Sequence, residues 1–218
     1  MMRGVTKEQI IKSVLDASFY KGASTISLSD VASGLGIKKA SLYNHIESRD
    51  EMFASTFDYC ELFLGKLKFI PDNIETVASR YSSQTVLKGI VKRRFRMHQK
   101  PPLLQIYFFL QSQKYYTSRA HSILKTQHER LASQIKTVLA ALSHSGKVSC
   151  GEDEFDAAAV WFCTGAEQLL CAMMIDLREA VLANQKDGAA IVEIPPALVD
   201  GGDMERVSLL VERFCTLL

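Results

Sequence analysis

The chain has 218 residues, of which 47% are hydrophobic, and its 26 basic and 24 acidic side chains leave a net charge of +2. This apolar content excludes a largely disordered chain, and the length suits one or two compact domains. The small net charge excludes a strongly basic surface over the whole molecule. Any affinity for nucleic acid must therefore come from a local cluster of basic side chains.

Several features favour a cytoplasmic protein. The chain has five cysteines, an odd number without a Cys-x-x-Cys pair, and its N-terminal residues carry no apolar signal core. The most apolar long stretch, residues 155–177, contains Asp156, Glu167, Gln168 and Asp176, which argues against a membrane span. The five histidines show no metal-ligand spacing, and we expect neither a metal nor another cofactor.

Helical periodicity dominates the chain and predicts an all-α fold of about nine helices. Apolar residues at three- and four-residue steps predict a first helix over 7–21, which Gly22 would end. Ser27 and Asp30 resemble a capping box that opens a second helix. A tight glycine turn then leads to a short third helix over about 38–44.

Ser48 and Glu51 form a second predicted capping box, which opens a fourth helix. Periodicity predicts further helices over 74–99, 102–114, 117–144, 153–185 and 203–217. Residues 187–202 are rich in Gly, Ala and Pro and predict an irregular connection. We expect a small N-terminal domain over 1–48 and a larger helical domain over 49–218.

Residues 27–49 read as a helix-turn-helix, a motif whose second helix enters the DNA major groove. Leu42, flanked by Ile37 and Ile46, can face a small core. The outward positions hold side chains that contact phosphates and base edges in DNA complexes: Lys38, Lys39, Ser41, Tyr43, Asn44 and His45. Cations at a helix start oppose the helix dipole by roughly a few tenths of a kcal/mol, and a neighbouring phosphate would offset that penalty. Arg49 repeats the pattern at the start of the fourth predicted helix.

The segment from Ile10 to Phe53 resembles the DNA-binding domain of the TetR family of transcriptional regulators. The matching residues are Ala17, Phe19, Gly22, Ser27, Leu28, Asp30, Val31, Ala32, Gly36, Ser41, Leu42, Tyr43, His45, Ser48 and Met52. The chain departs from the family at Ala40, where Gly or Pro is typical, at Ile46, where Phe is typical, and at Arg49, where Lys is typical.

The resemblance implies a homodimer that places one helix-turn-helix in each of two major grooves of a partly palindromic double-stranded operator. It also implies that Ser27, Tyr43 and His45 contact backbone phosphate, and that Arg49 takes the place of the family's phosphate-binding lysine. We expect base-edge contacts from Lys39, Ser41 and Asn44, whereas Lys38 suits either role.

In this family the C-terminal helices form the dimer interface and a ligand cavity. Small residues in 153–185 and an apolar face in 203–217 predict an interface from these two helices, although intramolecular packing would produce the same pattern. An apolar or aromatic effector would lie among aromatic and polar side chains that equally suit a core: Tyr107, Phe108, Gln111, Tyr115, His128, Trp161, Phe162 and Glu167. The basic residues in 92–100 suit a solvated helix face or, alternatively, an acidic effector.

The leading hypothesis is a repressor that a small effector releases from its operator. An activator of the same fold and a helical interaction module without specific DNA binding are the alternatives. An enzyme finds little support, since the sequence contains no Gly-rich phosphate loop, no Gly-x-Ser-x-Gly and no metal-binding motif.

Overall fold

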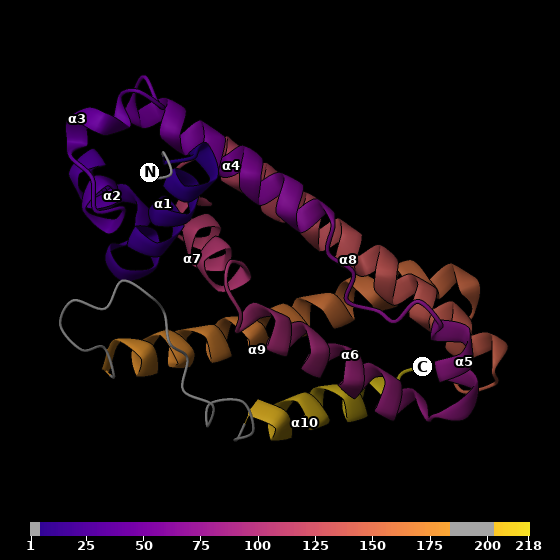
Figure 1. Ribbon diagram of the computed structural model, residues 1–218. Coiled ribbons are helices and arrows are strands. Elements are labelled where there is room, and N and C mark those ends of the chain that lie inside the picture. The colour runs from indigo at the N-terminus through magenta and orange to yellow at the C-terminus, as the bar shows by residue number, and fades with distance from the viewer. Residues whose placement is uncertain (1–4, 184–202) are drawn as a thin grey trace. The chain divides into compact units, whose positions relative to one another are not determined.

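The computed structural model describes residues 5–183 and 203–218, and Figure 1 shows the chain. These residues form ten α-helices and two short 3-10 helices with no strand, which confirms the predicted all-α class. The α-helices are α1 Lys7–Lys21, α2 Leu28–Gly34, α3 Lys39–Leu42, α4 Arg49–Gly65, α5 Ile74–Arg80, α6 Ser83–His98, α7 Leu103–Gln113, α8 Ser118–His144, α9 Phe155–Ala183 and α10 Asp203–Cys215.

Two predicted helices differ from the structure. The helix expected over 74–99 is two helices, because Tyr81 is extended and the Ser82 hydroxyl accepts a hydrogen bond from the Thr85 N–H at 3.2 Å, which caps α6. The third helix is a single turn, Lys39–Leu42, and residues 43–45 continue as a turn. The irregular connection expected at 187–202 lies outside the described residues.

Side-chain hydrogen bonds cap the starts of α1 and α4. The Thr6 hydroxyl accepts from the Gln9 N–H and the Gln9 side chain accepts from the Thr6 N–H, which fixes the start of α1. At α4 only half of the predicted capping box forms. Ser48 accepts from the Glu51 N–H, but the Glu51 carboxylate accepts from the Glu47 N–H instead of that of Ser48.

The described residues form two compact units. Unit 1 comprises residues 5–66 and 100–125, and unit 2 comprises 67–99, 126–183 and 203–218. The domain boundary that we expect after residue 48 falls inside unit 1. The functional division of the chain therefore stays a prediction, and the two units are described separately below.

In unit 1, α1 packs against α2, α4 and α7. The fully buried ring of Phe19 meets that of Phe108 edge-on at a centroid distance of 5.2 Å. The Gln105 side-chain amide donates to the Asp16 carboxylate at 2.9 Å, which adds a polar tie between α1 and α7. Part of the aromatic cluster predicted for an effector cavity thus contributes to the core around α1.

In unit 2, α10 packs against both α6 and α9 (Figure 1). The buried Phe214 ring lies 4.8 Å from that of Phe162 and 5.5 Å from that of Trp161. A Cβ atom at Gly165 would lie only 2.8 Å from Leu210 Cδ1, so the absent side chain lets α9 and α10 approach closely. Some of the small residues expected at a dimer interface therefore serve packing within the chain.

A buried ion pair joins α6 and α9. The Arg94 guanidinium, whose side chain is 7% exposed, binds the carboxylate of Glu167. Although burial alone would raise the pKa of Glu167, Arg94 lowers it, so the pair is charged at neutral pH. Breaking such a pair would leave a buried charge uncompensated, which typically costs about 3 to 5 kcal/mol.

One stretch within the described residues, Glu152–Ala183, is long and apolar enough in composition to cross a membrane, and most of it is the helix α9. The core helices of globular proteins meet the same condition. Ten residues of α9 are buried inside unit 2, whereas Trp161 and Ile175 remain about half exposed.

We expect His98 to make unfolding depend on pH. Burial, followed by the Arg94 charge, lowers the pKa of His98 to about 4, and its Nδ1–H donates to the Arg94 carbonyl oxygen at 2.9 Å. Because the unfolded chain takes up this proton near pH 6.5 and the folded chain near pH 4, stability falls as the pH drops through this window. The contribution is about 3 kcal/mol.

Urea unfolding at pH 7, 5.5 and 4 measures this effect. The variant His98→Gln should lose less stability over the same range by about 3 kcal/mol, because glutamine does not titrate. Equal pH dependence in the variant and in the natural chain would contradict the assignment to His98.

Candidate nucleic-acid interface

The helix-turn-helix is held to α1 by close contacts between the Ser13 side chain and the backbone of α2. The Ser13 hydroxyl donates to the Val31 carbonyl oxygen at 3.1 Å, and a Cβ atom at Gly34 would lie 2.7 Å from Ser13 Oγ. Gly36 has a φ of +67°, a conformation that other residues adopt at a cost. Both glycines are therefore needed where they stand, one for the approach of α2 to α1 and the other for the turn.

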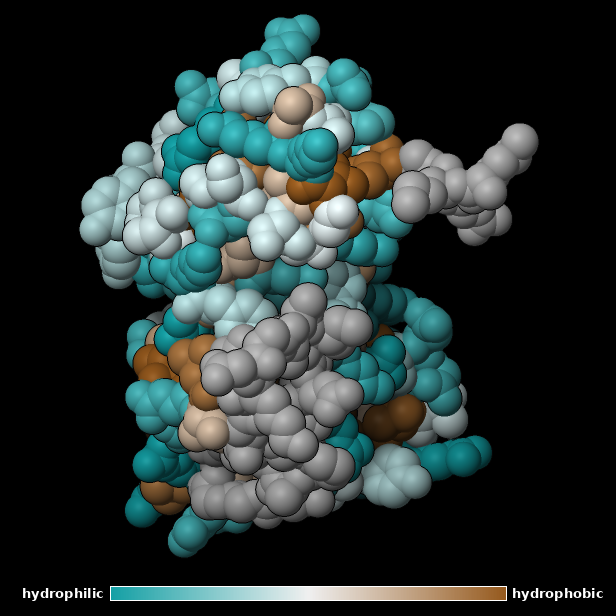
Figure 2. All heavy atoms as spheres, turned by 60° about the vertical axis from the view of Figure 1, so that its left-hand side comes forward, coloured by the Kyte–Doolittle hydropathy of each residue, from teal (hydrophilic) through white to brown (hydrophobic). Residues whose placement is uncertain are grey.

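The side chains of α3 and of the turn that follows it lie on two faces, one buried and one exposed. Leu42 and Ile46 are buried, whereas the polar side chains point to solvent, and Tyr43 is 52% exposed. The exposed members of the predicted DNA-binding set are Lys38, Lys39, Tyr43, Asn44 and His45, with Ser41 half-buried. Figure 2, which brings forward the side that carries α2 and α3, shows a mostly hydrophilic surface over these helices.

Lys38 and Lys39 stand at the start of α3, as predicted, and Lys38 is its N-cap without a side-chain cap bond. Because α3 is only one turn long, its dipole is weak, and the penalty for cations at its start is smaller than the sequence suggests. The absence of ion pairs among the described residues is stronger evidence for a phosphate-facing role than the helix dipole is. Neither lysine forms an ion pair or a hydrogen bond through its side chain with any of the residues that the structure describes.

Ser27 is already engaged in capping α2. Its hydroxyl donates to the Asp30 carboxylate at 2.7 Å and accepts from the Asp30 N–H at 3.2 Å. Asp30 also pairs with Lys21, and these contacts, first that of Lys21 and then that of Ser27, hold the pKa of Asp30 well below its usual range. A phosphate contact from Ser27 would therefore compete with the cap.

Arg49 turns toward the protein, which the sequence did not predict. Its Nε donates to the Ile26 carbonyl oxygen at 3.0 Å and its Nη2 to that of Ser24 at 3.1 Å. The guanidinium also lies 4.5 Å from the centre of the Phe53 ring. Arg49 therefore fixes the segment that leads into α2, and only part of its hydrogen-bonding capacity is left for a phosphate.

The predicted effector-lining residues fall in both units. In unit 1, Tyr107 is buried, Phe108 and Gln111 are half-buried, and Tyr115 is 81% exposed. Phe108 packs on Phe19, as described above, so its ring contributes to the core of unit 1.

The remaining four residues lie in unit 2. Phe162 is buried against Phe214, Trp161 is half exposed, and Glu167 pairs with Arg94. His128 contributes only the last and smallest of the charges that lower the pKa of Glu167. The sequence missed Arg94 because it lies 73 residues from Glu167 and within a run of basic residues.

Solved structures share this arrangement over nearly the whole chain. A TetR transcription regulator from Haloarcula marismortui matches with a TM-score of 0.61 and 14% identity, over 97% of each chain. The chain has the TetR-family fold. A TetR-family regulator from Marinobacter aquaeolei has a TM-score of 0.57 and 20% identity, over 96% of this chain and 98% of that one. A TetR-like regulator from Rhodococcus has a TM-score of 0.57 and 16% identity, over 98% of this chain and 97% of that one.

No protein-family model matches the sequence, and no curated protein matches it either. The likeness to the TetR-family regulators is thus one of fold. In the TetR fold described here, α1 to α3 occupy the first part of unit 1, and the exposed residues of the turn are the candidate DNA contacts.

Replacing Arg49 by lysine separates its structural contacts from a phosphate contact. A lysine keeps the positive charge but cannot reproduce the forked bonds to two carbonyl oxygens. We expect Arg49→Lys to lower the free energy of unfolding by about 1 kcal/mol, measured by urea denaturation. Arg119→Lys is the matched control, because Arg119 forms only exposed ion pairs with Asp58 and Glu61 and should lose less than about 0.5 kcal/mol. Equal losses would remove the special role of Arg49.

Proposed function

We propose that this chain is a transcriptional regulator of the TetR type, without enzymatic activity, that binds operator DNA in the cytoplasm as a homodimer. The observation that carries the proposal is the exposed group Lys38, Lys39, Tyr43, Asn44 and His45, which a buried Leu42 and Ile46 hold on one short element. These side-chain types contact phosphates and base edges in DNA complexes. Their position in a TetR fold supports the same function.

The contacts divide by the chemistry of the side chains. Tyr43 and His45 suit phosphate oxygens, to which each can donate one hydrogen bond. Lys39, Ser41 and Asn44 suit base edges, because Lys39 can donate hydrogen bonds and the other two can both donate and accept them. Lys38 can take either role. Ser27 and Arg49 play a smaller part, because their polar atoms already bind Asp30, Ser24 and Ile26.

The proposed dimer interface is a stripe along α9. Its members recur at steps of four and three residues and are exposed or half-buried: Ala157, Trp161, Thr164, Gln168, Cys171 and Ile175. None of them is charged, and such spacing places them along one face of a helix that suits a partner helix. A second copy of α9 would bury this face and explain why so apolar a helix is incompletely covered by its own chain.

The contribution of α10 to the dimer is smaller than the sequence suggests. Val207, Val211 and Phe214 are buried within unit 2, whereas Leu209 is exposed, as is Leu217 just after the helix. We propose that α9 provides the main contact and that exposed apolar residues of α10 extend it.

We further propose that the regulator is a repressor, which a small apolar or aromatic effector in the C-terminal helices releases from DNA. Release requires that the effector bind more tightly to a conformation that cannot engage both half-sites. An activator of the same fold would use the same DNA contacts and differ in the position of its operator relative to the promoter.

A gel-shift assay with genomic fragments at physiological salt tests the proposal directly. We expect a discrete complex that survives an excess of nonspecific competitor DNA, because specific complexes exceed nonspecific ones by about a thousandfold or more. A folded, dimeric protein without any specific complex would contradict the proposal. It would favour the helical interaction module instead.

Two substitutions, one in α3 and one in the turn that follows it, should have different effects. Tyr43→Ala removes a phosphate contact and should weaken operator and nonspecific DNA alike, by about 1 kcal/mol. Lys39→Ala removes a base contact and should reduce discrimination between operator variants by about 1 to 3 kcal/mol.

Fluorescence anisotropy with the operator and a scrambled duplex measures both effects. Lys12→Ala is the control, because this exposed lysine pairs with Glu8 on α1. Equal loss by Lys39→Ala on both duplexes would reassign Lys39 to the DNA backbone.

A charge in the α9 stripe tests the dimer. Ile175 is 50% exposed, and in a symmetric interface Ile175→Glu would introduce two carboxylates into an apolar contact. We expect the dimer to weaken by about 3 kcal/mol, roughly a hundredfold, in light-scattering measurements across a dilution series. Leu62→Glu, at a position on α4 that is 67% exposed, introduces the same charge and should leave the dimer intact. An unchanged dimer in the Ile175 variant would exclude the α9 stripe.

A further inference from the structure

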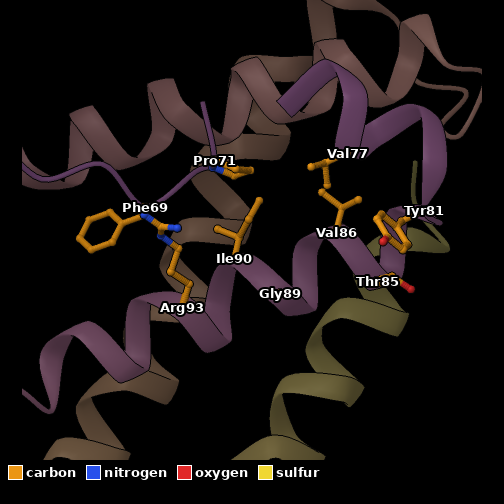
Figure 3. Close-up of a pocket in the computed structure, with 9 residues that line it drawn as sticks. All are labelled: Phe69, Pro71, Val77, Tyr81, Thr85, Val86, Gly89, Ile90 and Arg93. Carbon is orange, nitrogen blue, oxygen red and sulfur yellow. The ribbon is translucent and has the colours of Figure 1, made fainter. Parts of the chain in front are cut away.

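Unit 2 contains a pocket of about 280 Å³ along α5 and α6. Figure 3 shows that Phe69 and Arg93 lie at one end and Tyr81 and Thr85 at the other. The middle is apolar and consists of Pro71, Val77, Val86, Gly89 and Ile90. Thr85 and Arg93 are eight residues apart on α6, which corresponds to a length of about 12 Å. Arg93 belongs to the basic run over 92–100 for which the sequence left an acidic effector open, and the aromatic and polar residues predicted to line an apolar cavity do not line this pocket.

Gly89 keeps the floor of the pocket open. It lies in the interior of α6, where glycine is less favourable than alanine because it loses more backbone entropy. Its φ is not positive, and a Cβ atom added to it would meet no other atom within 4 Å. Neither backbone conformation nor close packing accounts for glycine here, in contrast to Gly34 and Gly165. The space it leaves belongs to the pocket.

One end of the pocket carries an excess positive charge. Arg93 is exposed and makes no ion pair or hydrogen bond among the described residues. The carboxylate of Asp72 senses this charge, since its pKa is lowered mainly by its contact with Lys68 and slightly by Arg93. Because Lys68 already compensates Asp72, this end retains a net charge of one from Arg93.

We propose that this pocket binds a small amphipathic carboxylate. The hydrocarbon part lies against Val77, Val86 and Ile90 over the open floor at Gly89, and the carboxylate binds the Arg93 guanidinium. An apolar lining with a single cation at one end matches an apolar chain with a single anionic head. The pocket is too small for an extended nucleotide conjugate, and its walls offer few polar groups to a sugar.

The pocket also has a route to influence α4. The Phe69 ring at its end stacks with His98 at 5.9 Å and lies 5.7 Å from the Arg94 guanidinium. The Phe69 N–H donates to the Gln134 side chain at 2.8 Å. Because Phe69 follows Gly65, the last residue of α4, by only four positions, the proposed regulation would act along the chain from the pocket to that helix. This regulatory role rests on the proposed DNA-binding function, whereas the binding of the carboxylate does not.

Three probes with eight carbon atoms each and different head groups test the chemistry of the pocket. Isothermal titration calorimetry of the full-length protein at neutral pH would use sodium octanoate, 1-octanol and octylammonium chloride. We expect saturable binding of one octanoate per chain, at least tenfold tighter than octanol, and no binding of octylammonium. Equal affinity for octanoate and octylammonium, or no saturable octanoate binding, overturns the proposal.

Two substitutions at Gly89 locate the site without weakening α6. Leucine is a good helix former and its side chain would occupy the pocket, so Gly89→Leu should lower octanoate affinity at least tenfold. Gly89→Ala adds a single methyl group and should keep octanoate affinity within about threefold of the natural chain. Both variants should unfold at the same or higher urea concentration. Octanoate binding that is unchanged in Gly89→Leu places the site elsewhere and overturns the proposal.

Arg93→Gln tests the head group. The variant should bind octanoate at least tenfold more weakly and should bind octanol within twofold of the natural chain. Unchanged octanoate affinity overturns the assignment to Arg93. Gel shifts of the same preparations without octanoate report on the proposed function alone, so a failure of DNA binding and a failure of octanoate binding are separate results. Loss of the DNA complex on adding octanoate, in the natural chain and not in Gly89→Leu, supports the regulatory role.

Discussion

The apolar face of α1 is the constraint on which the DNA-facing elements depend. A helix of one or two turns is not stable by itself in water, and α2 and α3 have only seven and four residues. Their positions follow from burial of Val31, Leu42 and Ile46 and from the hydrogen bond of Ser13 to Val31. The polar side chains of the turn are exposed because their apolar neighbours are fixed, so packing and the candidate interface have one cause.

Unit 2 depends on a different balance, between a buried charge and a large apolar surface. Arg94 is tolerated inside because Glu167 neutralises it, and the neighbouring His98 stays uncharged at neutral pH. The Phe69 ring contacts both Arg94 and His98 and also forms one end of the α5–α6 pocket. A change in the pocket therefore reaches a cluster in which small displacements are costly, because charges in a low dielectric interact strongly.

Local sequence signals predicted the helices well, and contacts between distant residues were not accessible to them. Gly22 ends α1 and the Ser27–Asp30 capping box opens α2 as predicted, because capping is decided within a few residues. The break at Tyr81 and Ser82 was missed, since helical periodicity continues across it. Arg49 was predicted to face DNA, but its carbonyl partners lie 23 and 25 residues earlier in the chain. The pocket at Gly89 depends on where α5 lies against α6, and the spacing of apolar residues within each helix does not predict that position.

Ion pairing decides which basic residues remain for DNA. Lys21 lies near the helix-turn-helix but is paired with Asp30, and Arg49 is held by two carbonyl oxygens. The uncompensated cations at the start of α3 are then Lys38 and Lys39. Two cations release few counterions, so one such element would bind DNA weakly at physiological salt. A second copy at a fixed distance makes the second contact intramolecular and multiplies the affinity. The proposed DNA binding thus requires the proposed dimer, and the uncharged stripe on α9 is as important to it as the lysines themselves.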